Sequence, residues 1–218
     1  MSTAYLGTSA FAAAVLERLA ATDHRPALVV TRPDRAAGRG RKLTPPPVAS
    51  TARELGLELF QPESINTAEA GARVAASGAD VVVVCAFGAL IKEPLPSDFE
   101  LLNVHPSLLP RWRGAAPVER AIMAGDEQTG VSIMRVTEGL DSGPVCLAQA
   151  EPIRPDDDYG TLAARLQQLG AMLLVRALDE HPPFVEQPED GSLELLEVQP
   201  PGGRPMPYAD YLRGHAAR

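Results

Sequence analysis

The chain has 218 residues, 45% of them hydrophobic, and can bury the core of one large domain or of one domain plus a fragment. Its net charge of −8 argues against general adhesion to nucleic acid, and two cysteines, Cys85 and Cys146, are too few for a disulfide framework. The N-terminus has no basic leader and no apolar run approaches the roughly 18 residues of a membrane span, so we expect a soluble cytoplasmic protein.

Short apolar runs alternate with helix-forming segments along most of the chain. The run from Val81 to Ala86 is apolar at every position, which is typical of a central parallel strand covered on both faces. The alternation predicts an α/β fold with a doubly wound, Rossmann-like, mostly parallel sheet. We expect strands at 4–6, 27–31, 57–60, 81–86, 101–105, 130–136 and 144–150, and helices at 11–21, 48–55, 68–76, 117–124 and 159–178.

The turn from Gly7 to Phe11 stands where such a fold often binds a nucleotide. It has one glycine where the dinucleotide fingerprint needs three, and serine and phenylalanine here would obstruct a pyrophosphate, so we exclude NAD and FAD. The four histidines lie far from one another and from either cysteine. We therefore expect no zinc site and no other metal.

The segment from Arg32 to Lys42 is unevenly charged. It holds five basic residues and one acid, a net charge of +4, which leaves −12 (−8 − 4) for the rest of the chain. A basic loop on an acidic body indicates a directed contact with an anion, because charge that only aids solubility would be spread out. The alternative is a solvated loop without a partner.

Polar side chains end the strand expected at 101–105. Asn103 and His105 are two residues apart, so both leave the same face of the strand, at the carboxyl end where open parallel sheets bind ligands. Asp141 lies in a later loop whose flanking glycines allow it to turn back toward the sheet. The three polar groups are predicted to converge. Alternatively, Asn103 and His105 only form the turn before Pro106, and Asp141 caps another turn.

A set of Asn, His and Asp without an activated Ser or Cys suits acyl transfer onto an external amine. Histidine, with an ordinary pKa of about 6.5, can take the proton of the attacking amine near neutral pH. Aspartate can orient the histidine and stabilise its charge, and an asparagine amide can donate to the oxyanion of a tetrahedral intermediate. We therefore predict His105 as the base, Asn103 as the oxyanion donor and Asp141 as the orienting residue.

Three motifs resemble the signature of the folate-dependent formyltransferases: 103–110 (NVHPSLLP), 130–133 (GVSI) and 140–143 (LDSG). The resemblance implies the formyltransferase N-terminal domain fold, with Asn103, His105 and Asp141 as the catalytic trio and 10-formyltetrahydrofolate as the formyl donor. It also implies a folate slot formed by Phe87, Gly88, Leu90, Ile91, Ser107, Leu108, Leu109 and Pro110.

Two further stretches are similar to the branch of this family that acts on methionyl-tRNA. One is the run 111–117 (RWRGAAP), and the other is the basic segment 31–43, which is similar to the insertion loop that enters the acceptor end of the tRNA. The alternatives are a formyltransferase for a small amine, such as glycinamide ribonucleotide or an amino sugar nucleotide, and a protein that binds folate or RNA without turnover. The resemblance implies initiator methionyl-tRNA as the partner, with phosphate contacts from Arg32, Arg35, Arg39, Arg41 and Lys42.

The resemblance is continuous over residues 1–191, which we interpret as one catalytic domain. Beyond Gly191 this branch would continue with a linker and a second, β-barrel domain. Residues 193–200 and 204–206 instead resemble the last strand and turn of that domain, and 208–215 its terminal helix. We interpret 192–218 as a strand–helix remnant joined at a deletion, and we expect a monomer that contacts no membrane.

Overall fold

A computed structural model describes residues 1–37, 42–188, 197–198 and 206–207. The main strands are β1 (Thr3–Gly7), β2 (Pro26–Val30), β5 (Leu59–Phe60), β6 (Val81–Cys85), β7 (Glu100–His105), β8 (Gln128–Arg135) and β9 (Val145–Pro152). The helices are α1 (Ala10–Ala20), α2 (Pro47–Glu54), α3 (Ala68–Ala76), α4 (Leu95–Asp98), α5 (Pro117–Ala124) and α6 (Tyr159–Glu180). None of the helices in these described ranges is long and apolar enough to cross a membrane.

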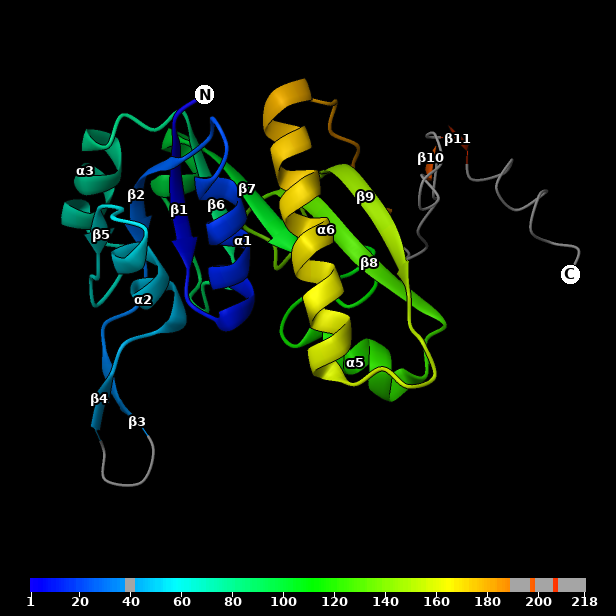
Figure 1. Ribbon diagram of the computed structural model, residues 1–218. Helices are drawn as coiled ribbons and strands as arrows, with labels where there is room; N and C mark the ends of the chain where they lie inside the picture. Colours follow the sequence, from blue (N-terminus) through cyan, green and yellow to red (C-terminus); the bar gives the residue numbers. More distant parts are fainter. Residues whose placement is uncertain (38–41, 189–196, 199–205, 208–218) are drawn as a thin grey trace, which may run out of the picture.

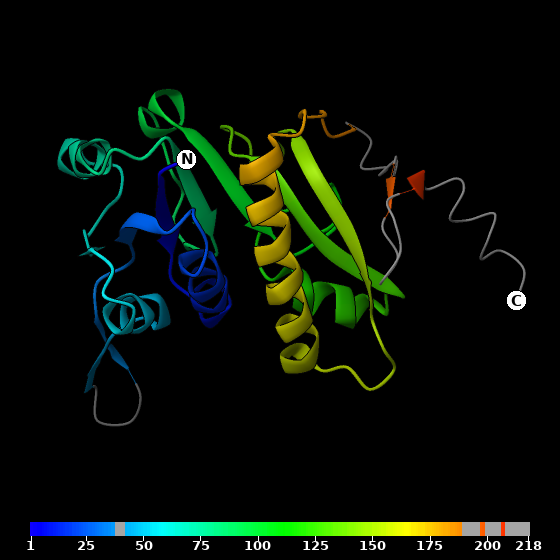
Figure 2. The same cartoon turned by 45° about the horizontal axis from the view of Figure 1, so that its top comes forward.

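The seven main strands form one sheet in the order β5-β2-β1-β6-β7-β8-β9 (Figure 1). The strands from β5 to β7 are parallel, whereas β8 runs antiparallel to both β7 and β9. Helices cover both faces of this sheet (Figure 2). The predicted α/β fold with a mostly parallel, doubly wound sheet is confirmed.

The sequence does not predict three of the elements. The basic segment, interpreted as a loop, contains an antiparallel hairpin of β3 (Arg35–Ala37) and β4 (Lys42–Thr44), and the short helix α4 precedes β7. Strands of only three residues, with the sequences RAA and KLT, are too short to show an alternation or an apolar run. By contrast, α3 and α5 begin and end as predicted, since Thr67 caps α3 and Pro117 begins α5.

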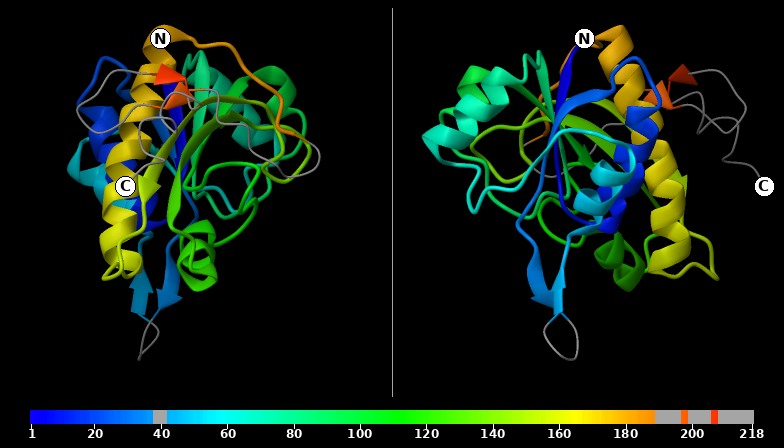
Figure 3. Two further views of the ribbon diagram at one scale, coloured as in Figure 1. Left: turned by 90° about the vertical axis from the view of Figure 1, so that its right-hand side faces the viewer. Right: turned by 60° about the vertical axis from the view of Figure 1, so that its left-hand side comes forward.

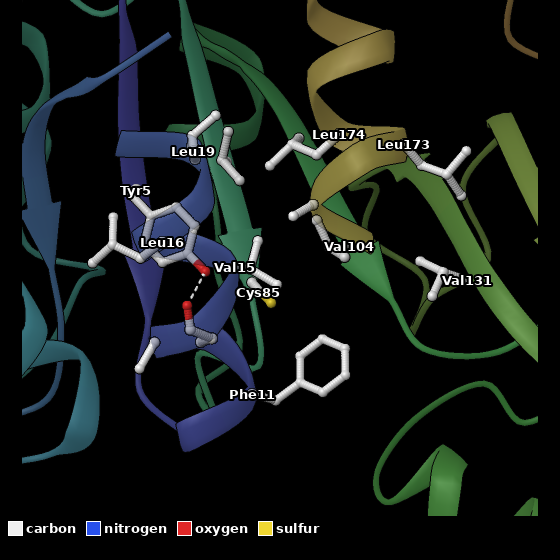
Figure 4. Packing of buried hydrophobic residues seen from close by; sticks show 14 of the residues in the cluster. Tyr5, Phe11, Val15, Leu16, Leu19, Cys85, Val104, Val131, Leu173 and Leu174 are labelled. Atoms are coloured by element: carbon white, nitrogen blue, oxygen red, sulfur yellow. Dashed lines mark hydrogen bonds between the residues drawn. The ribbon is translucent and has the colours of Figure 1, made fainter. Parts of the chain in front are cut away.

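The two faces of the sheet bury two separate apolar clusters. In β6, Val83 faces the cluster under α1 and α6, while Val82 faces the cluster beside α3 and α4. In the first cluster the Tyr5 hydroxyl donates to the Ala12 carbonyl at 2.7 Å (Figure 4). Burial raises the pKa of the Cys85 thiol to about 12, so this thiol stays protonated. Strand β6 is covered on both faces, as its unbroken apolar run predicts.

The strand order creates a topological switch point between β1 and β6. The chain leaves β1 toward β2 and leaves β6 toward β7, so the loops after Gly7 and Cys85, which pair in register, diverge. Asn103 of β7 pairs with Val84 of β6, which places the end of β7 beside this point. The β3–β4 hairpin projects from the same end of the sheet (Figures 1 and 3). The predicted catalytic, folate and tRNA segments therefore share one end of the molecule.

The last part of the chain is described only in two short strands. In it β10 (Glu197–Val198) pairs with β11 (Met206–Pro207) in an antiparallel register. The other residues of the predicted remnant, including the helix predicted at 208–215, lie outside the described residues. The division of the chain near residue 191 stays a prediction.

Candidate active site

Strand β7 carries Asn103 and His105 at its carboxyl end. Helix α6 packs closely against this strand, because a β-carbon on Gly170 would lie 2.9 Å from the Val104 side chain. His105 pairs with Ser132 of β8 and is only 4% exposed. The strand end is thus held from one face by a helix and from its edge by an antiparallel neighbour.

Asp141 reaches these two residues from the loop between β8 and β9. Its Oδ1 lies 3.3 Å from Nδ2 of Asn103, and its Oδ2 lies 3.5 Å from Nδ1 of His105. The backbone N–H of Gly114 donates to Oδ2 at 2.8 Å. Asp141 itself adopts a φ of 46°, in the left-handed region that few residues other than glycine occupy. The structure brings the three predicted residues together, and their chemical roles stay predictions.

The second ring nitrogen of His105 is also engaged. Nε2 lies 3.0 Å from the carbonyl oxygen of Trp112, and because a carbonyl only accepts, Nε2 carries a proton. In the neutral ring the lone pair is then on Nδ1, the atom that faces Asp141. Burial lowers the pKa of His105; Asp141 and the Trp112 carbonyl oppose this change, and Arg120 adds to it. The histidine is therefore held as a neutral ring whose basic nitrogen faces a carboxylate.

Arg120 of α5 holds the Trp112 carbonyl in place. Its guanidinium donates to the carbonyls of Trp112 and Arg113 at 3.0 and 2.5 Å. The Trp112 indole donates to Asp126 at 2.7 Å, and Arg111 donates twice to the same carboxylate, at 2.6 and 2.8 Å. These contacts fix Trp112 at a φ of 62°, which is unusual for a bulky residue. Sequence reasoning missed Arg120, because one arginine in a predicted helix gives no sign of the carbonyls it meets.

The predicted folate residues after β6 form a loop at the switch point. Phe87 and Ile91 are buried beside α3 and α4, whereas Leu90 is 59% exposed. Gly88 has a φ of 74°. Within the described residues, no protein group accepts a hydrogen bond from the backbone N–H of Gly88, Ala89 or Leu90. In this part of the chain the loop thus presents backbone donors without a protein acceptor and the exposed Leu90 side chain, while Phe87 and Ile91 anchor it in the core.

The predicted folate residues after β7 form a buried turn. Ser107 and Leu109 have no exposed surface, and Leu108 and Pro110 are also buried. The Ser107 hydroxyl donates to the Arg111 carbonyl at 2.6 Å. These side chains therefore support the end of β7 from within, and a contact between this turn and folate stays a prediction.

The basic residues predicted to bind tRNA occupy two places. Arg35 and Lys42 are exposed residues of the β3–β4 hairpin. This hairpin projects from the end of the sheet (Figure 3). Arg32 is exposed at the base of the hairpin, and its Nη1 lies 3.7 Å from the position that a β-carbon would take on Gly88. Arg32 therefore stands beside the switch-point loop. Arg39 and Arg41 lie outside the described residues.

Metal coordination would need several ligand side chains in one place. In the described part of the chain, no three His, Cys, Asp or Glu side chains are grouped so that they could hold a metal ion. Beside His105 and Asp141 the third polar group is the Asn103 amide, which donates to the carboxylate. The geometry is that of a carboxylate that accepts a hydrogen bond from the Asn103 amide and lies 3.5 Å from Nδ1 of His105.

Sequence comparison finds relatives that are named methionyl-tRNA formyltransferase. It is 48% identical over 203 residues to the methionyl-tRNA formyltransferase of Dechloromonas aromatica (strain RCB), a match that covers 91% of this chain and 66% of that protein. It is 49% identical over 195 residues to the methionyl-tRNA formyltransferase of Ruegeria pomeroyi, with 88% and 65% covered. The chain thus spans slightly less than two thirds of the length of these curated relatives.

Solved structures share the fold. Phosphoribosylglycinamide formyltransferase from Bacillus halodurans superposes with a TM-score of 0.68 at 24% identity, covering 83% of this chain and 95% of that one. Glycinamide ribonucleotide transformylase 1 from Geobacillus kaustophilus gives a TM-score of 0.67 at 25% identity, covering 84% and 98%. Residues 1–178, which include all three residues of the trio, match the family described as formyl transferase. The chain belongs to the formyl transferase family.

Proposed function

We propose that this protein transfers a formyl group from 10-formyltetrahydrofolate to the amino group of initiator methionyl-tRNA. The observation that carries the proposal is the meeting of Asn103, His105 and Asp141 at the carboxyl end of β7. Membership of the formyl transferase family and the name shared by the relatives support the same reaction. Residues 1–191 would form the catalytic domain and 192–218 a remnant of a second one.

His105 is proposed to move the proton of the acceptor amine. Its lone pair is on Nδ1, because Nε2 donates to the Trp112 carbonyl. In the structure Nδ1 lies 3.5 Å from Oδ2 of Asp141. When Nδ1 takes the amine proton, it becomes a hydrogen-bond donor facing this oxygen, and the carboxylate stabilises the imidazolium. The nitrogen–carbon bond to the acceptor forms, the bond from the formyl carbon to the folate nitrogen breaks, and His105 returns the proton to that leaving nitrogen.

Asn103 is proposed to stabilise the oxyanion of the tetrahedral intermediate. An asparagine amide has two N–H bonds, and one of them points to Oδ1 of Asp141 at 3.3 Å. The other remains for the formyl oxygen. Because Asp141 fixes the orientation of the amide before the substrate arrives, the donor needs no reorganisation during the reaction.

The loop 86–91 is proposed to bind the pterin of the folate. It lies at the switch point, where open α/β sheets bind their ligands. The unused N–H groups of Gly88, Ala89 and Leu90 match the acceptor atoms of a flat heterocycle, and the exposed Leu90 side chain gives it an apolar wall. Only this edge of the loop is free, since Phe87 and Ile91 are buried.

The hairpin is proposed to hold the tRNA. Arg35 and Lys42 are exposed on an element that projects beyond the reactive end of the sheet, which suits contact with phosphates outside the site. Arg32, beside the switch-point loop, would meet the tRNA closer to the reacting amine. We also propose that the protein acts as a monomer in the cytoplasm, where aminoacyl-tRNA is found.

A transfer assay with three acceptors tests this function. Labelled 10-formyltetrahydrofolate is supplied with initiator methionyl-tRNA, glycinamide ribonucleotide or an amino sugar nucleotide. We expect formylation of the tRNA and none of the small amines. Transfer to a small amine alone would favour the second kind of formyltransferase, and no transfer to any acceptor by folded protein would indicate a binding protein without turnover.

A further inference from the structure

Gln187 makes two hydrogen bonds to the loop that carries Asp141. Its Nε2 donates to the Asp141 carbonyl at 2.9 Å and to the Gly143 carbonyl at 2.7 Å. Both N–H bonds of the amide are used in this way. Gln187 follows α6 and lies 46 residues from Asp141 in the sequence, so the contact joins distant parts of the chain.

The carbonyl of the same amide binds a third segment. Oε1 of Gln187 accepts from Nε and Nη2 of Arg113, at 2.9 and 2.7 Å. Arg113 lies between Trp112, whose carbonyl binds His105, and Gly114, whose N–H binds the Asp141 carboxylate. One side chain therefore ties together the two loops that position His105 and Asp141.

The backbone beside Gln187 is itself fixed to the sheet. Val185 and Val145, the first residue of β9, exchange two backbone hydrogen bonds of 2.8 and 2.9 Å. The Gln187 amide thus reaches the Asp141 loop from a backbone segment that is hydrogen-bonded to the sheet. Such an anchor matters at Asp141, because its φ of 46° is a conformation that persists only when surrounding contacts hold it.

We propose that Gln187 is a positioning residue, which sets the distance between the Asp141 carboxylate and His105 through its bonds to the Asp141 and Gly143 carbonyls. This inference rests on the proposed function for its effect on rate. The role is distinct from substrate binding, because both N–H bonds of the Gln187 amide and its carbonyl are already used by contacts within the chain. Loss of the amide donors should therefore lower kcat and leave the KM of both substrates nearly unchanged.

The expected loss of kcat is about tenfold to a hundredfold, the cost of a misplacement of about 1 Å at a reacting group. Loss of the Gln187 contacts should also change the pKa of His105. Asp141 raises the pKa of His105 against the opposing effect of burial. If the carboxylate moves away, that support weakens, and the pKa of His105 falls further below its ordinary value.

Two substitutions separate the amide donors from the bond to Arg113. Gln187→Met keeps the length of the side chain and removes every polar contact. Gln187→Glu keeps an acceptor for Arg113 but replaces the donors with an oxygen that faces two carbonyls. Glu186→Gln is the matched control, because Glu186 is the exposed neighbour in the same segment. Thermal unfolding establishes that each full-length variant is folded.

Two readouts are measured on each protein: kcat and KM for transfer to methionyl-tRNA, and the titration of the His105 ring by NMR without substrate, with His105→Ala used for assignment. We expect both Gln187 variants to lose kcat and Glu186→Gln to match the parent. The titration is compared for Gln187→Met, which adds no charge, and we expect its histidine to titrate at lower pH than in the parent. A parent-like kcat in either Gln187 variant, or a parent-like titration in Gln187→Met, would overturn the proposal. If the parent formylates no tRNA, the proposed function fails, and the histidine titration alone decides: a shift supports the positioning role, and no shift refutes it.

Discussion

The carboxyl end of β7 and the β3–β4 hairpin hold their candidate functional side chains in opposite ways. Asn103 donates to Asp141, Asp141 lies 3.5 Å from His105, His105 and Asp141 each bond a backbone group, and His105 is almost completely buried. Arg35 and Lys42 are exposed, and no ion pair within the described residues involves either of them. Under the proposed function, the first region would fix atoms for chemistry before a substrate arrives, whereas the second would keep charge available for the tRNA. Substitutions should therefore affect rate in one region and affinity in the other.

The largest effect is expected for the pair formed by His105 and Asp141. His105→Ala and Asp141→Ala should each lower the transfer rate by roughly 10²–10⁴-fold, the usual contribution of a positioned base. The double variant should lose little more than the worse single one, because we propose that the two residues, 3.5 Å apart, act as a unit. Single-turnover kinetics of the four proteins measure this coupling.

A second His–Asp contact provides the control. His24 and Asp179 form a 2.7 Å pair on another part of the fold, and Asp179→Ala should leave the transfer rate unchanged. Losses that multiply in the double variant of His105 and Asp141 would show that the two residues contribute independently.

Asn103 should have the next largest effect. Asn103→Ala removes both the predicted oxyanion donor and the bond to Oδ1 of Asp141. We expect kcat to fall by about 10²–10³-fold, the usual cost of losing one such donor. Affinity for a folate analogue, measured by calorimetry, should change little because the donor acts in the transition state. A variant with parent-like kcat would exclude the oxyanion role.

The hairpin should affect affinity with a smaller magnitude. Arg35→Ala combined with Lys42→Ala should raise the KM for tRNA about tenfold, a change of about 1.4 kcal/mol in binding free energy. The slope of log K against log salt should decrease by about two, one for each phosphate that the variant no longer neutralises. Affinity for folate should stay as in the parent. An unchanged salt slope in this folded variant would exclude phosphate contacts and favour a small-amine acceptor.

The two regions also differ in how far the sequence predicts them. The spacing of Asn103 and His105 in a strand predicts their shared face, and glycines around Asp141 predict a loop that can turn back. The partner of His105 Nε2 is a backbone carbonyl, and the anchor of the Asp141 loop is a glutamine 46 residues away. No periodicity or motif carries such contacts, because they depend on how separate loops meet in space.

The sheet, too, is only partly predictable from the sequence. The unbroken apolar run of β6 predicts a central parallel strand, since only a strand covered on both faces can be apolar throughout. The antiparallel direction of β8 and β9 depends on the path of the connecting loops, and the runs of these strands do not encode it. The hairpin register is likewise absent from the sequence pattern, although the charge of the segment predicts its exposure.

The smallest expected effect concerns the loop 86–91, which is proposed to bind folate. In this loop the exposed Leu90 can be replaced without disturbing the buried Phe87 and Ile91. Leu90 is 59% exposed, so a ligand that covers it would bury apolar surface that water now contacts. Leu90→Ala should weaken binding of a formyl-folate analogue about fivefold, which corresponds to about 1 kcal/mol of apolar burial. Met172→Ala is the control, because Met172 is 52% exposed on α6 and takes no part in the proposed slot.

Leu109, a second residue of the predicted folate slot, has no exposed surface, so its substitution is expected to change stability and not a surface contact. Leu109→Ala should lower the free energy of unfolding by about 2–5 kcal/mol through the cavity it leaves, whereas Leu90→Ala should leave stability within about 0.5 kcal/mol of the parent. Calorimetric titration and denaturant unfolding on the same samples distinguish the two effects. If Leu90→Ala binds the analogue as tightly as Met172→Ala does, the pterin does not contact Leu90, and only the free backbone donors of this loop would remain as its binding edge.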